Sequence, residues 1–247
     1  MKYFLIILMS ILSTVCSASY QLATTANGIN LKNHIFYTYS SAKTPEALMA
    51  EGPVFNRLAQ KNMFEGLKHA WYSVSFESQL ADEKAWFINT LQPTVPILRV
   101  HMLDSKGAWQ LIFDAESKFH EREVKDPLMV FSFKVSPLVK TRLLIEYQGL
   151  QGIPLSFMLY DEKNLEKRAI EHFLFNTLLI FFCLLIGVFS LVNMFVSPSK
   201  SQFYSVSFLS FCLAFLIAFM IADMSGFTVQ YLWPGSPEIN KFMPMLL

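Results

Sequence analysis

Hydrophobic and polar positions divide the chain into two parts, short alternating runs followed by long apolar runs. From residue 19 to about residue 160, β-like runs alternate with clusters of Gly, Pro, Asp and Ser. In one run Leu98 and Val100 alternate with Arg99 and His101, which is the period of a half-buried strand. Eight short strands separated by turn residues favour a β-sandwich or jelly roll for residues 19–160. The predicted strands are residues 35–39, 71–76, 85–91, 97–103, 109–113, 129–135, 142–147 and 155–160.

One helical turn is predicted between the first two of these strands. Thr44 is a residue type that caps helix N-termini, and Pro45 suits the first helical position. Gly52 and Pro53 end the turn after residues 46–51. The domain is therefore expected to be all-β with one short helix.

Two long apolar runs follow the predicted strands. A charged connector, residues 161–172, leads into residues 173–196, which carry no charge. At 1.5 Å per residue this run makes a helix about 36 Å long, enough to cross a bilayer. A second uncharged run, residues 203–221, is also long enough. Residues 242–247 begin a further apolar run, which we interpret as a third transmembrane helix cut short by the end of the chain.

Residues 1–18 have the composition of a secretory signal peptide. Lys2 gives a positive start, residues 4–12 are apolar, and small residues up to Ala18 offer a cleavage site. A lipoprotein signal ending at Cys16 is the alternative, but Val15 stands where a small residue is expected. A signal peptide sends the β domain outward, so the turn at residues 197–202 is expected in the cytoplasm.

The composition is that of a membrane protein with a folded domain. Hydrophobic residues make up 53% of the chain and charged residues 16%, whereas soluble domains carry about 25% charged residues. The formal net charge of +1 argues against a nucleic-acid binder, which would show a basic field. The three cysteines are Cys16, Cys183 and Cys212, so the predicted β domain contains no disulfide.

Several short motifs follow one another along the chain. QYLWP at residues 230–234 lies between the second and third apolar runs. The motifs of the β part are EALMAEGPVF at residues 46–55, the strand that starts with Trp71 and Tyr72, GAWQ at 107–110, VFSF at 130–133 and QGIPL at 151–155. In this order and spacing they resemble the motifs of the bacterial 7TMR-DISM family, which are seven-transmembrane receptors with diverse intracellular signalling modules. The resemblance covers nearly all of the chain after residue 18.

The resemblance implies a periplasmic jelly-roll sensor of the family's second extracellular type, similar to carbohydrate-binding modules. It also implies a helix bundle that relays the state of the sensor to a cytoplasmic module, often a diguanylate cyclase or a histidine kinase. The chain holds neither such a module nor helices three to seven, so the chain alone is expected not to signal. Ser73 and Glu146 stand where the family commonly has Arg.

Catalytic motifs are missing from the sequence. No GxSxG, HExxH, P-loop or nucleotide-binding glycine motif occurs, and the five histidines lack metal-ligand spacing. Asp114 and Glu116 could act as an acid and base pair, although acidic loop residues are common in any protein. We therefore expect no enzyme activity, no metal and no cofactor.

Candidate functional residues come from aromatic, charged and amide side chains. Flat rings beside polar donors are typical of sugar-binding surfaces, but strand-borne aromatics are even more typical of a sandwich core. Amides inside an apolar helix usually pack against another helix. The candidates are Trp71, Tyr72, Arg99 and Trp109 for ligand binding, Asn176 and Asn193 for helix packing or relay, and Tyr231 and Trp233 for the membrane interface.

Three classes of function are compatible with these features. The first is a multi-pass receptor of the bacterial inner membrane that binds a small molecule or carbohydrate in the periplasm. Its other partners would be membrane lipid and a second copy of the chain, with no nucleic acid. The alternative is a membrane-tethered carbohydrate-binding module without signalling. The third class is an envelope enzyme or transporter subunit, against which the missing catalytic and intramembrane charged residues count.

Overall fold

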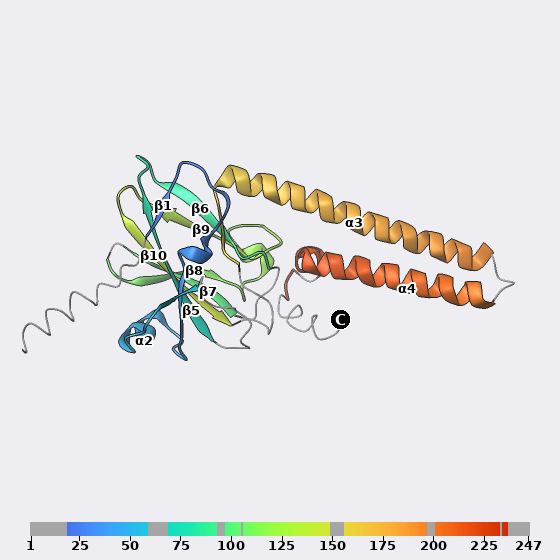
Figure 1. Cartoon of the computed structure of the whole chain (residues 1–247), viewed down its shortest axis with the longest axis horizontal. Helices are drawn as coiled ribbons and strands as arrows, with labels where there is room; N and C mark the ends of the chain where they lie inside the picture. The colour runs from blue at the N-terminus through green and yellow to red at the C-terminus, as the bar shows by residue number, and fades with distance from the viewer. Residues whose placement is uncertain are drawn as a thin grey trace, which may run out of the picture.

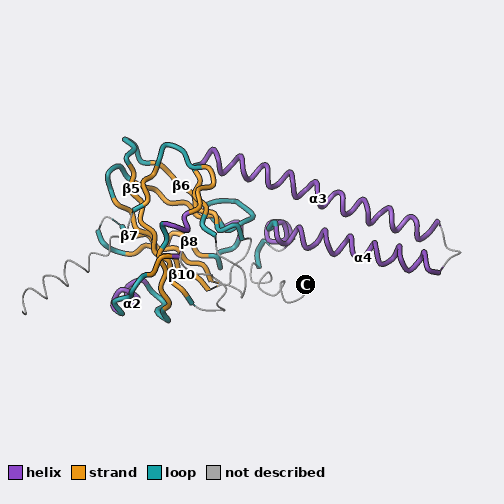
Figure 2. The backbone as a smooth tube through the Cα atoms, in the orientation of Figure 1, coloured by secondary structure: helices purple, strands orange, loops and turns teal. Residues whose placement is uncertain are grey.

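The structure of the chain is a computed structural model, in which a β-rich domain is followed by two long helices (Figures 1 and 2). It describes residues 19–58, 69–92, 97–104, 106–148, 156–196, 201–232 and 234–236. The predicted signal peptide, the QGIPL motif, the start of the predicted cytoplasmic turn, Trp233 and the partial third helix lie outside the described residues.

Eleven strands form two sheets in the described part of the chain. The larger sheet has the order β4 (Asn56–Arg57), β3 (Phe36–Tyr39), β5 (Ala70–Ser78), β10 (Lys140–Gln148), β7 (Ile97–Leu103) and β8 (Trp109–Asp114), with β1 (Tyr20–Leu22) parallel to β5. The smaller sheet has the order β2 (Asn27–Asn30), β11 (Met158–Tyr160), β6 (Lys84–Asn89) and β9 (Val130–Val135). The other strand pairs are antiparallel.

Each of the eight predicted strands overlaps an observed one. The three strands that the pattern missed are β1, β2 and β4, which are only two to four residues long. Such short segments show too little alternation to be recognised in the sequence. Two 3₁₀ helices, η1 (Leu31–Asn33) and η3 (Phe119–Glu121), lie in the connections.

The two sheets share one hydrophobic core, which confirms the predicted sandwich-like arrangement of antiparallel sheets. Val74 and Phe76 of β5 face Phe131 and Phe133 of β9, and all four side chains are at most 3% exposed. The rings of Phe76 and Phe133 lie 4.7 Å apart. Burial of such apolar surface is the main contribution to the stability of the domain.

One short helix covers part of the outer face of the larger sheet. Helix α2 (Pro45–Ala50) begins as predicted, because the Thr44 side chain accepts a hydrogen bond from the Ala47 amide and Pro45 takes the first position. Its buried Leu48 packs with Trp71 of β5 and Leu144 of β10. The central strands β5 and β10 are therefore buried on both faces, which fixes their register.

The helices α3 (Glu162–Val196) and α4 (Ser201–Met224) run side by side away from the sandwich and back to it (Figure 1). Both are long and apolar enough to cross a membrane, and only 11% of each apolar window is buried within the structure. At their contact, a Cβ on Gly187 would lie 3.7 Å from the Cβ of Ala214. Small residues of this kind let two membrane helices approach closely.

Residues 162–172 of the charged connector form the first turns of α3. No Pro or Gly interrupts residues 162–186, so the helical hydrogen bonds continue into the apolar run. Asp161 caps this helix, because its side chain accepts from the Asn164 amide at 2.9 Å. The other carboxylate oxygen accepts from the Ala26 amide at 3.0 Å, which joins the start of α3 to the sandwich.

A loop between β8 and β9, residues 115–129, contacts helix α3 and the turn that follows α4. Asp126 pairs with Arg168 of α3 at 3.4 Å, and the exposed fractions of the two side chains are 5% and 16%. Gly226, just after α4, lies against Pro127, where a Cβ on the glycine would approach the Pro127 carbonyl oxygen to 2.4 Å. Through this loop the sandwich is joined to the first turns of α3 and to the turn that follows α4.

Candidate functional site

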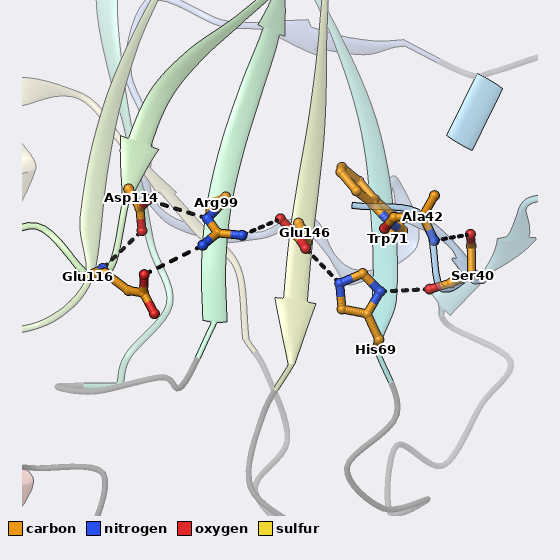
Figure 3. A network of polar contacts seen from close by, with 8 residues as sticks. All are labelled: Ser40, Ala42, His69, Trp71, Arg99, Asp114, Glu116 and Glu146. Carbon is orange, nitrogen blue, oxygen red and sulfur yellow. Dashed lines mark hydrogen bonds and ion pairs between the residues drawn. The ribbon is translucent and has the colours of Figure 1, made fainter. Parts of the chain in front are cut away.

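The outer face of the larger sheet carries most of the candidate ligand-binding residues. Trp71 is completely buried beneath α2, and its ring N–H donates to the Ala42 carbonyl at 3.1 Å (Figure 3). Trp109 is partly buried against the same cluster. These two residues belong to an apolar cluster with Leu48 and Leu144. A polar network lies at one end of this sheet face and a cavity at the other.

Glu146 of β10 is the centre of the polar network, with a side chain only 2% exposed. Its Oε1 lies 2.6 Å from His69 Nε2, and the other ring nitrogen of His69 lies 2.6 Å from the Ser40 carbonyl oxygen (Figure 3). A carbonyl oxygen only accepts, so His69 Nδ1 donates. The contact between Nε2 and the carboxylate links His69 to β10.

Arg99 of β7 extends the network toward the sheet edge. Its guanidinium contacts Asp114 at 3.3 Å, Glu146 at 3.4 Å and Glu116 at 3.5 Å (Figure 3). Burial acts to lower the pKa of Arg99, but Asp114 and Glu146 outweigh it and raise the pKa. The positive charge of Arg99 is already matched by three carboxylates, so this end of the face is not a favourable place for an anion.

His101 lies between the polar network and Trp71. Its ring is 5.9 Å from the Trp71 ring, and its buried Nε2 has no hydrogen-bond partner among the described residues. Burial lowers the pKa of His101 below its usual value of 6.5. Arg99 and His101 share a face of β7, as the alternation of the sequence predicted, and His101 is neutral there at pH 7.

The cavity at the other end of this face has a volume of about 460 Å³. Arg142 of β10 lies in its wall, where Nε donates to the Ser73 hydroxyl at 3.2 Å. The guanidinium carbon is 5.8 Å from the centre of the Phe55 ring. Phe36 and Met49 complete an apolar lining around these polar groups. A cavity with a few polar groups in an apolar wall is the usual form of a small-molecule site.

The structure brings together only some of the residues that the sequence singled out. Tyr72 is 4% exposed and belongs to the core between the sheets, so neither Trp71 nor Tyr72 offers a free ring face for stacking. The ligand-binding roles given to these two residues and to Arg99 and Trp109 stay predictions. The sequence reasoning did not propose Arg142, because nothing near it in the chain indicates that it meets Ser73, 69 residues earlier.

The candidate residues on the helices differ in their burial. Asn176 is 9% exposed, and its amide nitrogen lies 3.0 Å from the ring of His172, one turn earlier on the same helix. Asn193 is exposed on the surface of α3. Tyr231 lies in a short π-helix, η4 (Thr228–Leu232), and is 60% exposed, with its ring stacked on that of Phe227. An exposed Tyr beside the end of an apolar helix fits an interfacial position.

Neither a metal nor a disulfide is indicated in the described part of the chain. There, no group of three His, Cys, Asp or Glu side chains could hold a metal ion. Cys183 and Cys212 are free thiols on the two long helices.

Comparisons with known proteins give little further information. No protein-family model matches the chain, and no curated protein sequence matches it. Among solved structures, the family 32 carbohydrate-binding module from Streptococcus pneumoniae EndoD is similar over 54% of this chain and 100% of that chain. The identity is 10% and the TM-score 0.23, and a likeness this distant says nothing about what the present chain binds.

Proposed function

We propose that this chain is the input part of a membrane receptor. The β-sandwich, with jelly-roll connectivity, lies in the periplasm and binds a small envelope molecule of the carbohydrate class. The two helices cross the inner membrane, begin the seven-helix bundle of a 7TMR-DISM receptor, and relay the bound state toward a cytoplasmic cyclase or kinase module.

One observation carries this proposal, namely the loop of residues 115–129, which contacts α3 and the turn that follows α4. Its Asp126 pairs with Arg168 on α3, and its Pro127 packs against Gly226 after α4. The loop also connects β8 of the larger sheet with β9 of the smaller one. Relative movement of the two sheets therefore changes the loop that positions the helices. A receptor needs such an element, because a ligand acts only by favouring one of two arrangements.

The hairpin shape of the helix pair also supports the proposal. Since α3 leaves the sandwich and α4 returns to it, both ends near the sandwich lie on the same side of a membrane that the pair crosses. This matches a domain exported by a signal peptide. The exposed apolar side chains of both helices would be covered by lipid and by further helices.

The proposal is tested with the full chain in lipid nanodiscs. Neutral sugars and sugar acids are screened for a rise in the unfolding midpoint. Pulsed EPR then measures the distance between spin labels at Lys134→Cys on β9 and Glu171→Cys on α3, with Cys183 and Cys212 replaced by Ser. We expect a stabilising sugar to change the distance in this chain, and to change it less when Gly226→Ala disturbs the contact with Pro127.

Two other outcomes have defined meanings. A sugar that raises the midpoint but leaves the distance unchanged would support the alternative, a tethered binding module without signalling. If no compound raises the midpoint, both the receptor and the tethered module are wrong as stated.

A further inference from the structure

The cavity beside Arg142 differs electrostatically from the rest of the outer face. Its wall is formed by β3, β5 and β10 together with the segment that follows α2. Of the described residues that line it, Arg142 alone carries a charge. Its volume of about 460 Å³ falls within the range of 300–1,000 Å³ that is common for small-molecule sites.

Arg142 lacks the carboxylate partners that Arg99 has. Arg99 contacts three carboxylates, whereas no described carboxylate pairs with Arg142, whose contacts are the Ser73 hydroxyl and the Phe55 ring. Burial lowers the pKa of Arg142, so the guanidinium has lost part of its hydration. A half-buried cation with no matching anion is costly, and an anion that enters the cavity offsets this cost.

The hydrogen-bonding pattern leaves one edge of the guanidinium for a ligand. Nε is used by the Ser73 hydroxyl, and the face of the group lies against Phe55. Nη1 and Nη2 form no hydrogen bond to any described residue. Two parallel N–H groups match the two oxygens of a carboxylate or phosphate.

The apolar part of the cavity wall determines which uncharged part of a ligand fits beside Arg142. Phe36, Met49 and Phe55 present apolar and aromatic surface beside the guanidinium. Such surface packs against a hydrocarbon ring or against the apolar face of a sugar ring, and a small inorganic ion cannot fill it. The cavity therefore combines one anion-binding edge with a surface for a ring.

We propose that this cavity binds a small organic anion, a carboxylate or phosphate on a ring-shaped body, with Arg142 on the anionic group. The inference rests on the proposed function, because it narrows the ligand of the receptor from carbohydrates in general to anionic ones such as sugar acids. It does not depend on whether binding is relayed to the helices.

The test uses matched charged and neutral probes on the full chain in nanodiscs. Glucuronate is compared with glucose, and benzoate and phenyl phosphate are compared with benzamide, by isothermal titration. Empty nanodiscs correct for partition into lipid. We expect at least one anion to bind tenfold or more tightly than its neutral counterpart, because charge-assisted bidentate hydrogen bonds have no neutral equivalent. The pair that shows the effect tells whether the body is a sugar or an aromatic ring.

Variants then assign the effect to the cavity. Arg142→Gln should weaken anion binding at least tenfold, and Arg142→Lys should restore only part of it. Lys134→Gln, a change at a side chain 70% exposed on the smaller sheet, should leave it unchanged. Phe55→Ala keeps the charge and should weaken binding of both members of a pair. Circular dichroism and the unfolding midpoint check that each variant is folded.

The results separate this inference from the proposed function. Equal binding of charged and neutral probes, no binding of any anion, or full binding by a folded Arg142→Gln variant overturns the inference. If neutral sugars bind as tightly as anionic ones and change the EPR distance, the receptor stands and the inference fails. If an anion binds through Arg142 without changing the distance, the inference stands and the relay fails.

Discussion

Three arginines of the sandwich show how folding places similar side chains in different electrostatic surroundings. Arg99 is matched by three carboxylates, and Arg142 faces a cavity. Arg122, after η3, is 5% exposed, and none of its guanidinium nitrogens has a hydrogen-bond partner among the described residues. Burial lowers the pKa of Arg122 accordingly. The guanidinium carbon of Arg122 lies 5.8 Å from the centre of the Phe119 ring, a contact that offsets part of the cost of burying the charge without hydrogen bonds. We expect the net effect of Arg122 on stability to be unfavourable.

Replacing Arg122 by Met should raise the free energy of unfolding. The variant removes an unpaired buried charge, which costs about 1–3 kcal/mol in the folded state. The matched change Arg168→Met should lower the free energy of unfolding by about 3 kcal/mol, because Asp126 is then left buried without its partner. Denaturant unfolding of the full chain in detergent measures both. A loss of stability in Arg122→Met would show that the contact with the Phe119 ring outweighs the cost of the buried charge.

His101 should make the stability of the sandwich depend on pH. Because its pKa is lowered in the folded state, the unfolded chain binds a proton at about pH 6.5 and the folded chain only at lower pH. Stability is therefore full above pH 6.5 and falls as the pH drops below it, by at most about 1.4 kcal/mol per pH unit. The charged groups that act on the ring are Glu146, Glu46, Arg99 and Asp114.

The measurement compares unfolding of the full chain at pH 7.5 and pH 5.5. His101→Gln should show a smaller loss of stability between these two values than the unchanged chain. An equal loss in both proteins would assign the pH dependence to groups other than His101.

At the scale of elements, the helix pair depends on small residues at its contact. Gly187, Ser190 and Met194 of α3 are buried, as are Ala214 and Ala218 of α4. They recur at helical spacing and so form one seam along the pair. Asn176 is buried nearer the start of α3, and its amide contacts His172 of the same helix. The two helices are therefore held together mainly by the packing of the seam and not by this amide.

Gly187 gives the sharpest test of this seam. Gly187→Ala should be tolerated or slightly stabilising, because a Cβ there lies at ordinary contact distance and Ala favours the helix by about 1 kcal/mol. Gly187→Leu should separate the helices and lower the unfolding midpoint of the full chain in detergent. Equal midpoints for the Ala and Leu variants would show that the two helices do not pack at this position.

At the scale of the whole molecule, the proposed orientation combines the hairpin of α3 and α4 with the predicted signal peptide. We expect a cysteine at Ser41, which is exposed on the sandwich, to react with an impermeant maleimide added to the periplasm. A cysteine at Ser199, between the two helices in sequence, should react only after the membrane is permeabilised. The background carries Ser at positions 183 and 212. The reverse labelling pattern would mean that the sandwich is cytoplasmic.

Sequence alone determined the features that depend on neighbouring residues. Alternation of side chains located the long strands β5, β7, β9 and β10, because a strand repeats every two residues. Thr44 and Pro45 located the start of α2, because capping involves residues within one turn. The two apolar runs located the long helices, because length and hydropathy are local properties.

Only the tertiary structure decided which side chains meet. The contact of Arg142 with Ser73 joins residues 69 positions apart, and the contact of His69 with Glu146 joins residues 77 positions apart. Both depend on strand pairings that no local pattern specifies. Only the folded chain shows that Trp71 and Tyr72 are both buried, because aromatic alternation in the sequence cannot distinguish a core ring from a binding ring. Strand register is set by cooperative packing of the whole sandwich, which is why the cavity became visible only in the folded chain.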